Sequence, residues 1–131
     1  MKLMIDTNIL ISALVWPQST PAIALLHATT NYELILCDTI IHELYNVVER
    51  KWPHLLGDAD VFLAELPYEL IAAPKQADKL VHDPKDQPIL NAAILAQVDI
   101  IISGDKHFLK AGLEHPRVLT AVQYLEEFKI E

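Results

Sequence analysis

Short apolar runs, separated by segments long enough to form a helix, constrain the fold of this chain more than any other feature. The clearest run is Ile100–Ser103, and a similar run opens the sequence at Lys2–Ile5. Neither run alternates apolar with polar residues, which is typical of strands buried on both faces of a parallel sheet. We predict further strands at Leu34–Leu36, Leu70–Ala73 and Val118–Thr120.

The segments between these strands carry the signals of helices. Most of them begin at a proline or at a residue that favours the N-cap position, and their apolar residues recur at helical spacing. We predict helices that start at Pro21 with Thr20 as its cap, run from Asp38 as the cap to Arg50, start at Pro53, run from Asp86 to Gln97 and run from Ala121 to Phe128. The Asp86–Gln97 helix is apolar nearly all round, which predicts burial. Asn8–Leu14 is predicted to be an apolar turn.

Strands that alternate with helices predict parallel pairing, with helices on both faces of the sheet. We therefore expect an α/β protein of three layers, α/β/α, with a central parallel sheet of four to five strands. A length of 131 residues predicts a single domain over residues 1–131. The single cysteine, Cys37, excludes an intrachain disulfide, which favours a reducing compartment and a cytoplasmic protein. No apolar run approaches the ~20 residues of a membrane span, so we expect no membrane partner.

Acidic residues follow two of the predicted strands directly. Asp6 ends the run at Lys2–Ile5 with no Lys or Arg beside it, and Asp105 lies just past Ile100–Ser103. In an open parallel sheet, ligands bind outside the carboxyl ends of the strands, where the strand order reverses. If these two strands are neighbours, their carboxylates converge at that edge. Asp86, at the start of the helix that precedes Ile100–Ser103, would lie at the same end.

Close carboxylates repel each other, and one of them becomes hard to ionise unless a cation lies between them. Oxygen ligands without a cysteine or a histidine pair favour Mg²⁺ or Mn²⁺ over Zn²⁺. Such a site typically directs a metal-bound water at a phosphodiester. A formal net charge of −8 argues against a nucleic-acid partner when taken alone, since phosphate contacts rest on Lys and Arg. Acidic residues gathered in a metal site would inflate that negative count.

Four stretches of the sequence place these acids in recognisable surroundings. "IDTNILISAL" contains Asp6 and Asn8, and "DTIIHELYNVV" contains Glu43 on the helix after the second strand. "DPKDQPILNAAILAQVD" contains Asp83 and Asp86, and "IIISGDKHFL" contains the hydroxyl and the acid at positions 103 and 105. In this order they resemble the motifs of the PIN-domain family of metal-dependent ribonucleases, in particular its VapC-like toxin branch. The resemblance extends over nearly the whole chain.

The resemblance implies a homodimeric, metal-dependent endoribonuclease that acts on RNA and is the toxin of a toxin–antitoxin pair, with a small antitoxin protein covering its acidic cleft. It implies that four carboxylates hold one or two Mg²⁺ or Mn²⁺ ions and carry catalysis, those of Asp6, Glu43, Asp86 and Asp105. Asn8 and Ser103 would orient ligands and water, and Asp83 would be accessory. Gln87 stands where this branch often has Asn or Asp, and it cannot ligate as a carboxylate. Lys106 is a candidate contact to substrate phosphates.

Each acid also has a purely structural interpretation. Asp6 and Asp105 could serve turns after strands, and Asp86 could cap a helix. On the residues alone, Glu43 falls on the polar face of its helix, where a glutamate is normally solvated. Two other functions are alternatives to the nuclease. One is a non-catalytic PIN-like module that binds RNA or a protein, and the other is a phosphotransfer receiver-type domain. The receiver expects an aspartate after a middle strand, whereas Leu70–Ala73 is followed by proline.

Overall fold

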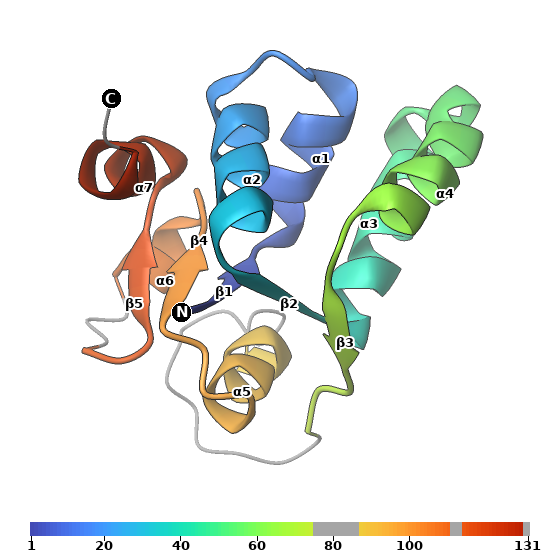
Figure 1. The fold of residues 1–131 in the computed structure, drawn as a ribbon. Coiled ribbons are helices and arrows are strands. Elements are labelled where there is room, and N and C mark those ends of the chain that lie inside the picture. Colours follow the sequence, from blue (N-terminus) through green and yellow to red (C-terminus); the bar gives the residue numbers. More distant parts are fainter. Residues whose placement is uncertain (75–86, 111–113, 130–131) are drawn as a thin grey trace.

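Five parallel strands form one sheet in the order β3-β2-β1-β4-β5 (Figure 1). The structure is a computed structural model that describes residues 1–74, 87–110 and 114–129. Its strands are β1 (Lys2–Ile5), β2 (Glu33–Cys37), β3 (Glu69–Ile71), β4 (Ile100–Ile102) and β5 (Arg117–Leu119). Every neighbouring pair in this sheet is parallel. The predicted α/β class and the parallel pairing of the strands are therefore confirmed.

Helices cover both faces of this sheet. They are α1 (Thr7–Val15), α2 (Thr20–Asn31), α3 (Asp38–Lys51), α4 (Leu56–Glu65), α5 (Gln87–Leu95), α6 (Lys106–Leu109) and α7 (Ala121–Phe128), with a 3₁₀ turn, η1, at Pro53–Leu55. Figure 1 shows α1 and α2 on one side of the sheet and α5 on the other. The arrangement is the predicted three-layer α/β/α fold.

Helix α1 corrects the prediction of an apolar turn at Asn8–Leu14. The backbone N–H groups of Ile9 and Leu10 donate to the Asp6 carbonyl at 3.1 and 3.2 Å, which starts the helix. Isoleucine lowers intrinsic helix propensity, but Ile9, Leu10 and Ile11 are all buried, and their burial outweighs that preference. Helix α6 also has no counterpart in the prediction, because four residues give too short a pattern. In the described part of the chain no single helix could cross a membrane; α1 and α2 pass by length and composition only as a pair, bent by 109°.

The caps of α2 and α7 involve residues to which the sequence analysis gave other places. Ser19 caps α2 in place of Thr20, and its hydroxyl accepts a hydrogen bond from the Ala22 N–H at 3.3 Å. Thr120 does not end a strand but caps α7, where its hydroxyl and the Gln123 side chain each accept a backbone N–H of the other residue. Both caps satisfy N–H groups that a helix start leaves without partners.

Asp38 is the first residue of α3 and not its cap. Its Oδ1 accepts hydrogen bonds from the N–H groups of Thr39 and Ala73, both at 2.9 Å. The second bond fastens the chain after β3 to the end of β2. The strand predicted at Leu70–Ala73 accordingly lies at Glu69–Ile71, because the Ala73 N–H is taken by this side chain.

The helix predicted from Asp86 to Gln97 is α5, and Asp86 itself lies outside the described residues. The side of α5 that is buried carries Ile89, Leu90, Ala92 and Ala93. Ile94 is 46% exposed and Leu95 is 65% exposed, so the predicted burial of this helix does not extend to its last turn. A helix in an outer layer presents only part of its circumference to the sheet.

The central strand β1 and its neighbour β4 lie deep in the core. Leu3, Met4 and Ile5 of β1 and Ile101 and Ile102 of β4 are fully buried. Burying one such side chain contributes roughly 1.5–3 kcal/mol to folding. The ends of β1 and β4 are therefore fixed points, and residues that follow them directly are held in place.

Candidate active site

The strand order reverses between β1 and β4. From β1 the chain proceeds to β2 and β3 on one side, and it then returns to β4 and β5 on the other. Ile5 pairs with Ile102, and the Asp6 N–H donates to the Ile102 carbonyl at 3.0 Å. The condition on which the convergence of Asp6 and Asp105 depended, that these two strands are neighbours, is therefore met. Their carboxyl ends form the place where open α/β sheets bind ligands.

A serine hydroxyl joins the ends of these two strands. Ser103, the residue after β4, donates from Oγ to Asp6 Oδ2 at 2.6 Å, and the same oxygen accepts the Asp105 N–H at 2.9 Å. Because the hydroxyl accepts that N–H, its own proton is directed to Asp6. Ser103 is fully buried and Asp6 is 3% exposed. Asp6, Ser103 and the Asp105 backbone are thus held together at the carboxyl edge of the sheet.

Helix α3 brings a third carboxylate to this edge. Thr7, the first residue of α1, is buried and donates from Oγ1 to Glu43 Oε2 at 2.9 Å. Glu43 is half-buried and not on a solvated face, because α1 packs against α3. Sequence reasoning missed Thr7. The available signal was a hydroxyl next to Asp6 that opens an otherwise apolar segment.

The three carboxylates share an unfavourable electrostatic environment. Burial is the largest cause that raises the pKa of Asp6, to about 6 from 3.8. The hydrogen bond from Ser103 and one from the Thr7 backbone lower this pKa, whereas the negative charges of Asp105 and Glu43 raise it. Asp6 therefore loses its proton at a higher pH than an ordinary aspartate does, and a bound cation would act in the opposite direction.

The donor atoms near this end of the sheet have the chemistry that a hard divalent cation prefers. The donors are carboxylate oxygens, which Mg²⁺ and Mn²⁺ prefer. Within residues 1–74, 87–110 and 114–129, no group of three or more His, Cys, Asp or Glu side chains is placed so that it could hold a metal ion. Asp86 and Asp83, which were predicted for the same site, lie outside the described residues. Asp6, Glu43 and Asp105 thus supply carboxylates near one end of the sheet, but within the described residues they do not by themselves form a metal site.

Three further predicted residues have different surroundings. Asn8 is exposed on α1, and its side chain forms no hydrogen bond within the described part of the chain, so it does not hold Asp6. Lys106 begins α6, and its side chain lies outside what the structure describes. Gln87 is buried, and its Nε2 donates to Asn91 Oδ1 at 2.7 Å within α5.

A groove of about 750 Å³ adjoins Glu43. Ile41 and Tyr45 of α3 line it from one side, and Leu70 and Pro88 contribute from β3 and α5. The Tyr45 hydroxyl donates to Asp60 Oδ1 at 2.5 Å, which fixes the ring. The carboxylate edge therefore opens to solvent beside an apolar wall.

Comparisons with known proteins agree with this geometry. The sequence model of the PIN domain family matches residues 2–107. None of the curated proteins matches the sequence. The chain is similar to a chain in the crystal structure of VapBC2 from Rickettsia felis bound to a DNA fragment from their promoter, with a TM-score of 0.70, 17% identity, and coverage of 92% of this chain and 98% of that one. At this identity the likeness shows a shared fold. Because the family match covers most of its length, this chain belongs to the PIN domain family.

Proposed function

We propose that this chain is a divalent-metal-dependent endoribonuclease and the toxin of a toxin–antitoxin pair. The contact between Asp6 and Ser103 at the reversal of strand order carries the proposal, because it fixes a buried carboxylate at the ligand-binding edge. PIN domains are generally nucleases that use divalent metals. Similarity to a chain of a VapBC complex supports the toxin role and an antitoxin partner.

Asp6, Glu43, Asp105 and Asp86 would hold one or two Mg²⁺ or Mn²⁺ ions. When bound, the metal supplies an activated water and offsets the charge that develops on the attacked phosphate. The chain itself supplies orientation. Ser103 fixes the Asp6 carboxylate and favours its ionised form, and Thr7 fixes one oxygen of Glu43.

The acidic character of the site determines which charges its partners need. An RNA strand meets carboxylates at this edge, so its phosphates need the cation and basic groups elsewhere on the protein. A basic antitoxin segment would be attracted to the same edge, and a second copy of the chain would complete the proposed homodimer. We propose that the protein, its RNA substrate and its antitoxin meet in the cytoplasm.

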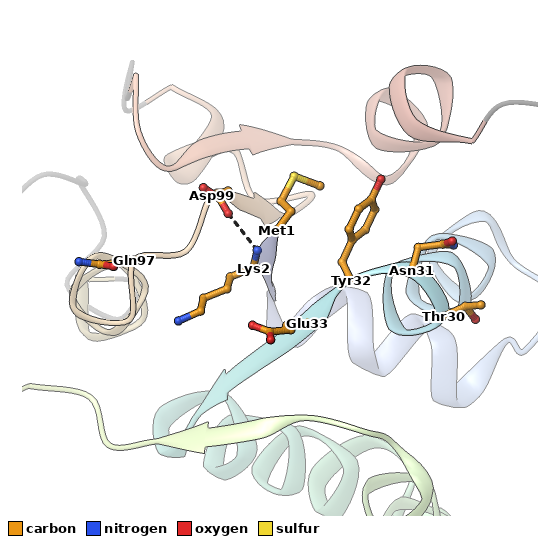
Figure 2. Close-up of a pocket in the computed structure, with 8 residues that line it drawn as sticks. All are labelled: Met1, Lys2, Thr30, Asn31, Tyr32, Glu33, Gln97 and Asp99. Atoms are coloured by element: carbon orange, nitrogen blue, oxygen red, sulfur yellow. Dashed lines mark hydrogen bonds between the residues drawn. The ribbon is translucent and has the colours of Figure 1, made fainter.

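The direct test is cleavage of labelled RNA by the purified chain in Mn²⁺, Mg²⁺ or EDTA. We expect cleavage with metal, none in EDTA, and a loss of at least about a hundredfold in Asp6→Asn, a change that removes a ligand charge. Asp99→Asn is the matched control, because Asp99 lies at the opposite edge of the sheet in the pocket of Figure 2. It should cleave as wild type does.

Equal cleavage by wild type and Asp6→Asn would contradict the proposal, as would no cleavage with either metal. If the chain binds RNA equally well with and without Asp6 but never cleaves it, the non-catalytic binding module becomes the better account. Toxicity on expression that Asp6→Asn relieves would support the toxin role separately.

A further inference from the structure

The two helices that begin at the acidic edge both end in a tryptophan. Trp16 is the C-cap residue of α1, and Trp52 is the C-cap residue of α3. Their rings meet edge to face, with centroids 6.0 Å apart and an interplanar angle of 87°. These are the two tryptophans of the chain. Their pairing therefore marks one place on the surface, away from the carboxylates.

The two rings differ in burial. Trp52 is half-buried and packs against the hydrophobic core, whereas Trp16 is 55% exposed. An anchored ring thus supports a ring that faces solvent. Such an aromatic surface is typical of sites where nucleobases stack.

One cation lies at the aromatic pair, and a second precedes it in the chain. Lys51 Nζ lies 5.9 Å from the centroid of the Trp52 ring, and Arg50 is the exposed residue before it. Neither cation has an ion-pair partner among the described residues, where Arg117 with Glu127 is the recorded pair. Glu49 is also exposed in this turn, so two positive charges face one negative. In a chain of net charge −8 this turn is locally positive, which favours an anionic partner.

The distance to the acidic edge suits a continuous strand of nucleic acid. Trp16 lies ten residues beyond Asp6, and Trp52 lies nine residues beyond Glu43. At 1.5 Å per helical residue, both tryptophans are about 15 Å from the carboxylates. Because α1 packs against α3, the two helices run together from one place to the other. A few nucleotides of extended RNA span that distance.

We propose that Trp16, Trp52, Arg50 and Lys51 form an accessory binding site for single-stranded RNA. A base stacks on the exposed face of Trp16, and the flanking phosphates contact the guanidinium and ammonium groups. The link to cleavage rests on the proposed nuclease function, but RNA binding at this site does not.

Tryptophan emission tests the site without interference, because both fluorophores belong to it. The protein is titrated with a short oligouridine in EDTA, so that no cleavage occurs. We expect quenching that saturates, an affinity that falls as salt rises, and roughly tenfold weaker binding after Trp16→Ala. Lys51→Gln should weaken binding and reduce the salt slope by about one. Leu26→Ala and Lys129→Gln are the controls, since they remove an exposed apolar side chain and a cation from other surfaces.

Failure of this site and failure of the nuclease proposal give different results. No quenching by RNA, in a chain that still cleaves RNA with metal, overturns the accessory site alone and points to a protein partner for this surface. Binding that Trp16→Ala and Lys51→Gln leave unchanged also overturns it, because the RNA then binds elsewhere. Saturable quenching lost in both variants supports it even in a chain that never cleaves.

Discussion

The two edges of the sheet both carry carboxylates, but the chain treats them differently. At the amino edge, Asp99 accepts the Lys2 N–H at 2.9 Å, and its own N–H donates to the Lys2 carbonyl at 2.9 Å. Figure 2 shows these residues lining a pocket of about 490 Å³, in which Lys2 also places its ammonium group. Asp99 thus links the starts of β1 and β4, and its carboxylate accepts one backbone N–H there.

At the carboxyl edge the donors are hydroxyl and backbone groups. Ser103 serves Asp6 and Thr7 serves Glu43, and no Lys or Arg pairs with either carboxylate in the described residues. The charges of Glu43 and Asp105 act against ionisation of Asp6. The fold holds these groups together although they repel each other.

The contrast separates a structural acid from a candidate ligand. Asp99 is half-buried and joins two strands through its hydrogen bond from the Lys2 N–H, so it serves the fold. A buried carboxylate with a perturbed pKa in a group of like charges destabilises the protein alone and indicates a functional site. We therefore expect the same substitution to have opposite effects at the two edges.

The largest expected difference is in stability without metal. Burial raises the pKa of Asp6 from 3.8 to about 6, so the folded state binds more protons than the unfolded state in this window. The free energy of unfolding then falls as the pH rises from about 4 to about 6. Above about pH 6 the ionised carboxylate lowers this free energy by roughly 3 kcal/mol. In EDTA at neutral pH, Asp6→Asn should gain up to that amount, and the gain should vanish below about pH 4.

Urea unfolding at a series of pH values measures this difference. Asp99→Asn should gain nothing and lose about 1 kcal/mol, because an amide is a weaker acceptor than a carboxylate. A loss of stability in Asp6→Asn at neutral pH would remove the distinction between the two edges.

Ser103→Ala sharpens the comparison by removing the donor that favours ionised Asp6. The variant loses the bond to Asp6 and the acceptor for the Asp105 N–H. We expect metal affinity to fall about 10- to 100-fold, which is usual when a group that orients a ligand is lost. Calorimetric titration with Mn²⁺ measures it, and Ser103→Thr, which keeps the hydroxyl, is the control. Unchanged affinity in Ser103→Ala would show that this hydroxyl has no part in the site.

A smaller effect is expected from Thr7→Val, which preserves shape and removes the hydroxyl that holds Glu43. With one oxygen of Glu43 no longer fixed, the rate of RNA cleavage should fall about tenfold while the fold is retained. Thr7→Ser should restore most of the rate, which a purely steric role for Thr7 would not predict. Steady-state cleavage of the same labelled RNA distinguishes a hydrogen-bonding role of Thr7 from a purely steric one.

The sheet was predictable because its strands are continuous apolar runs with a fixed polarity. Lys2–Ile5 and Ile100–Ser103 each lead into an acid, so neighbouring parallel strands bring Asp6 and Asp105 to one edge. Glu43 was identified only by the family resemblance. The polar residues on its helix face predict a solvated surface, so the residue pattern alone did not point to a ligand.

The side-chain contacts of Thr7 and Asp38 with distant elements could not be predicted. Thr7 reaches Glu43 over 36 positions, and this requires α1, whose isoleucines conceal the helix until their burial is known. Asp38 looked like a cap, but its bond to Ala73 depends on how β3 ends. The roles of Asp83 and Asp86 stay predictions, since both residues lie outside the described chain.

Thermal unfolding in the presence and absence of Mn²⁺ tests the central claim, that the carboxyl edge is a cation site. A ligand that binds only the folded state raises the melting temperature in a concentration-dependent way. We predict that millimolar Mn²⁺ raises it for wild type and for Asp99→Asn but not for Asp6→Asn. Equal rises in all three proteins, or none in wild type, would contradict the account.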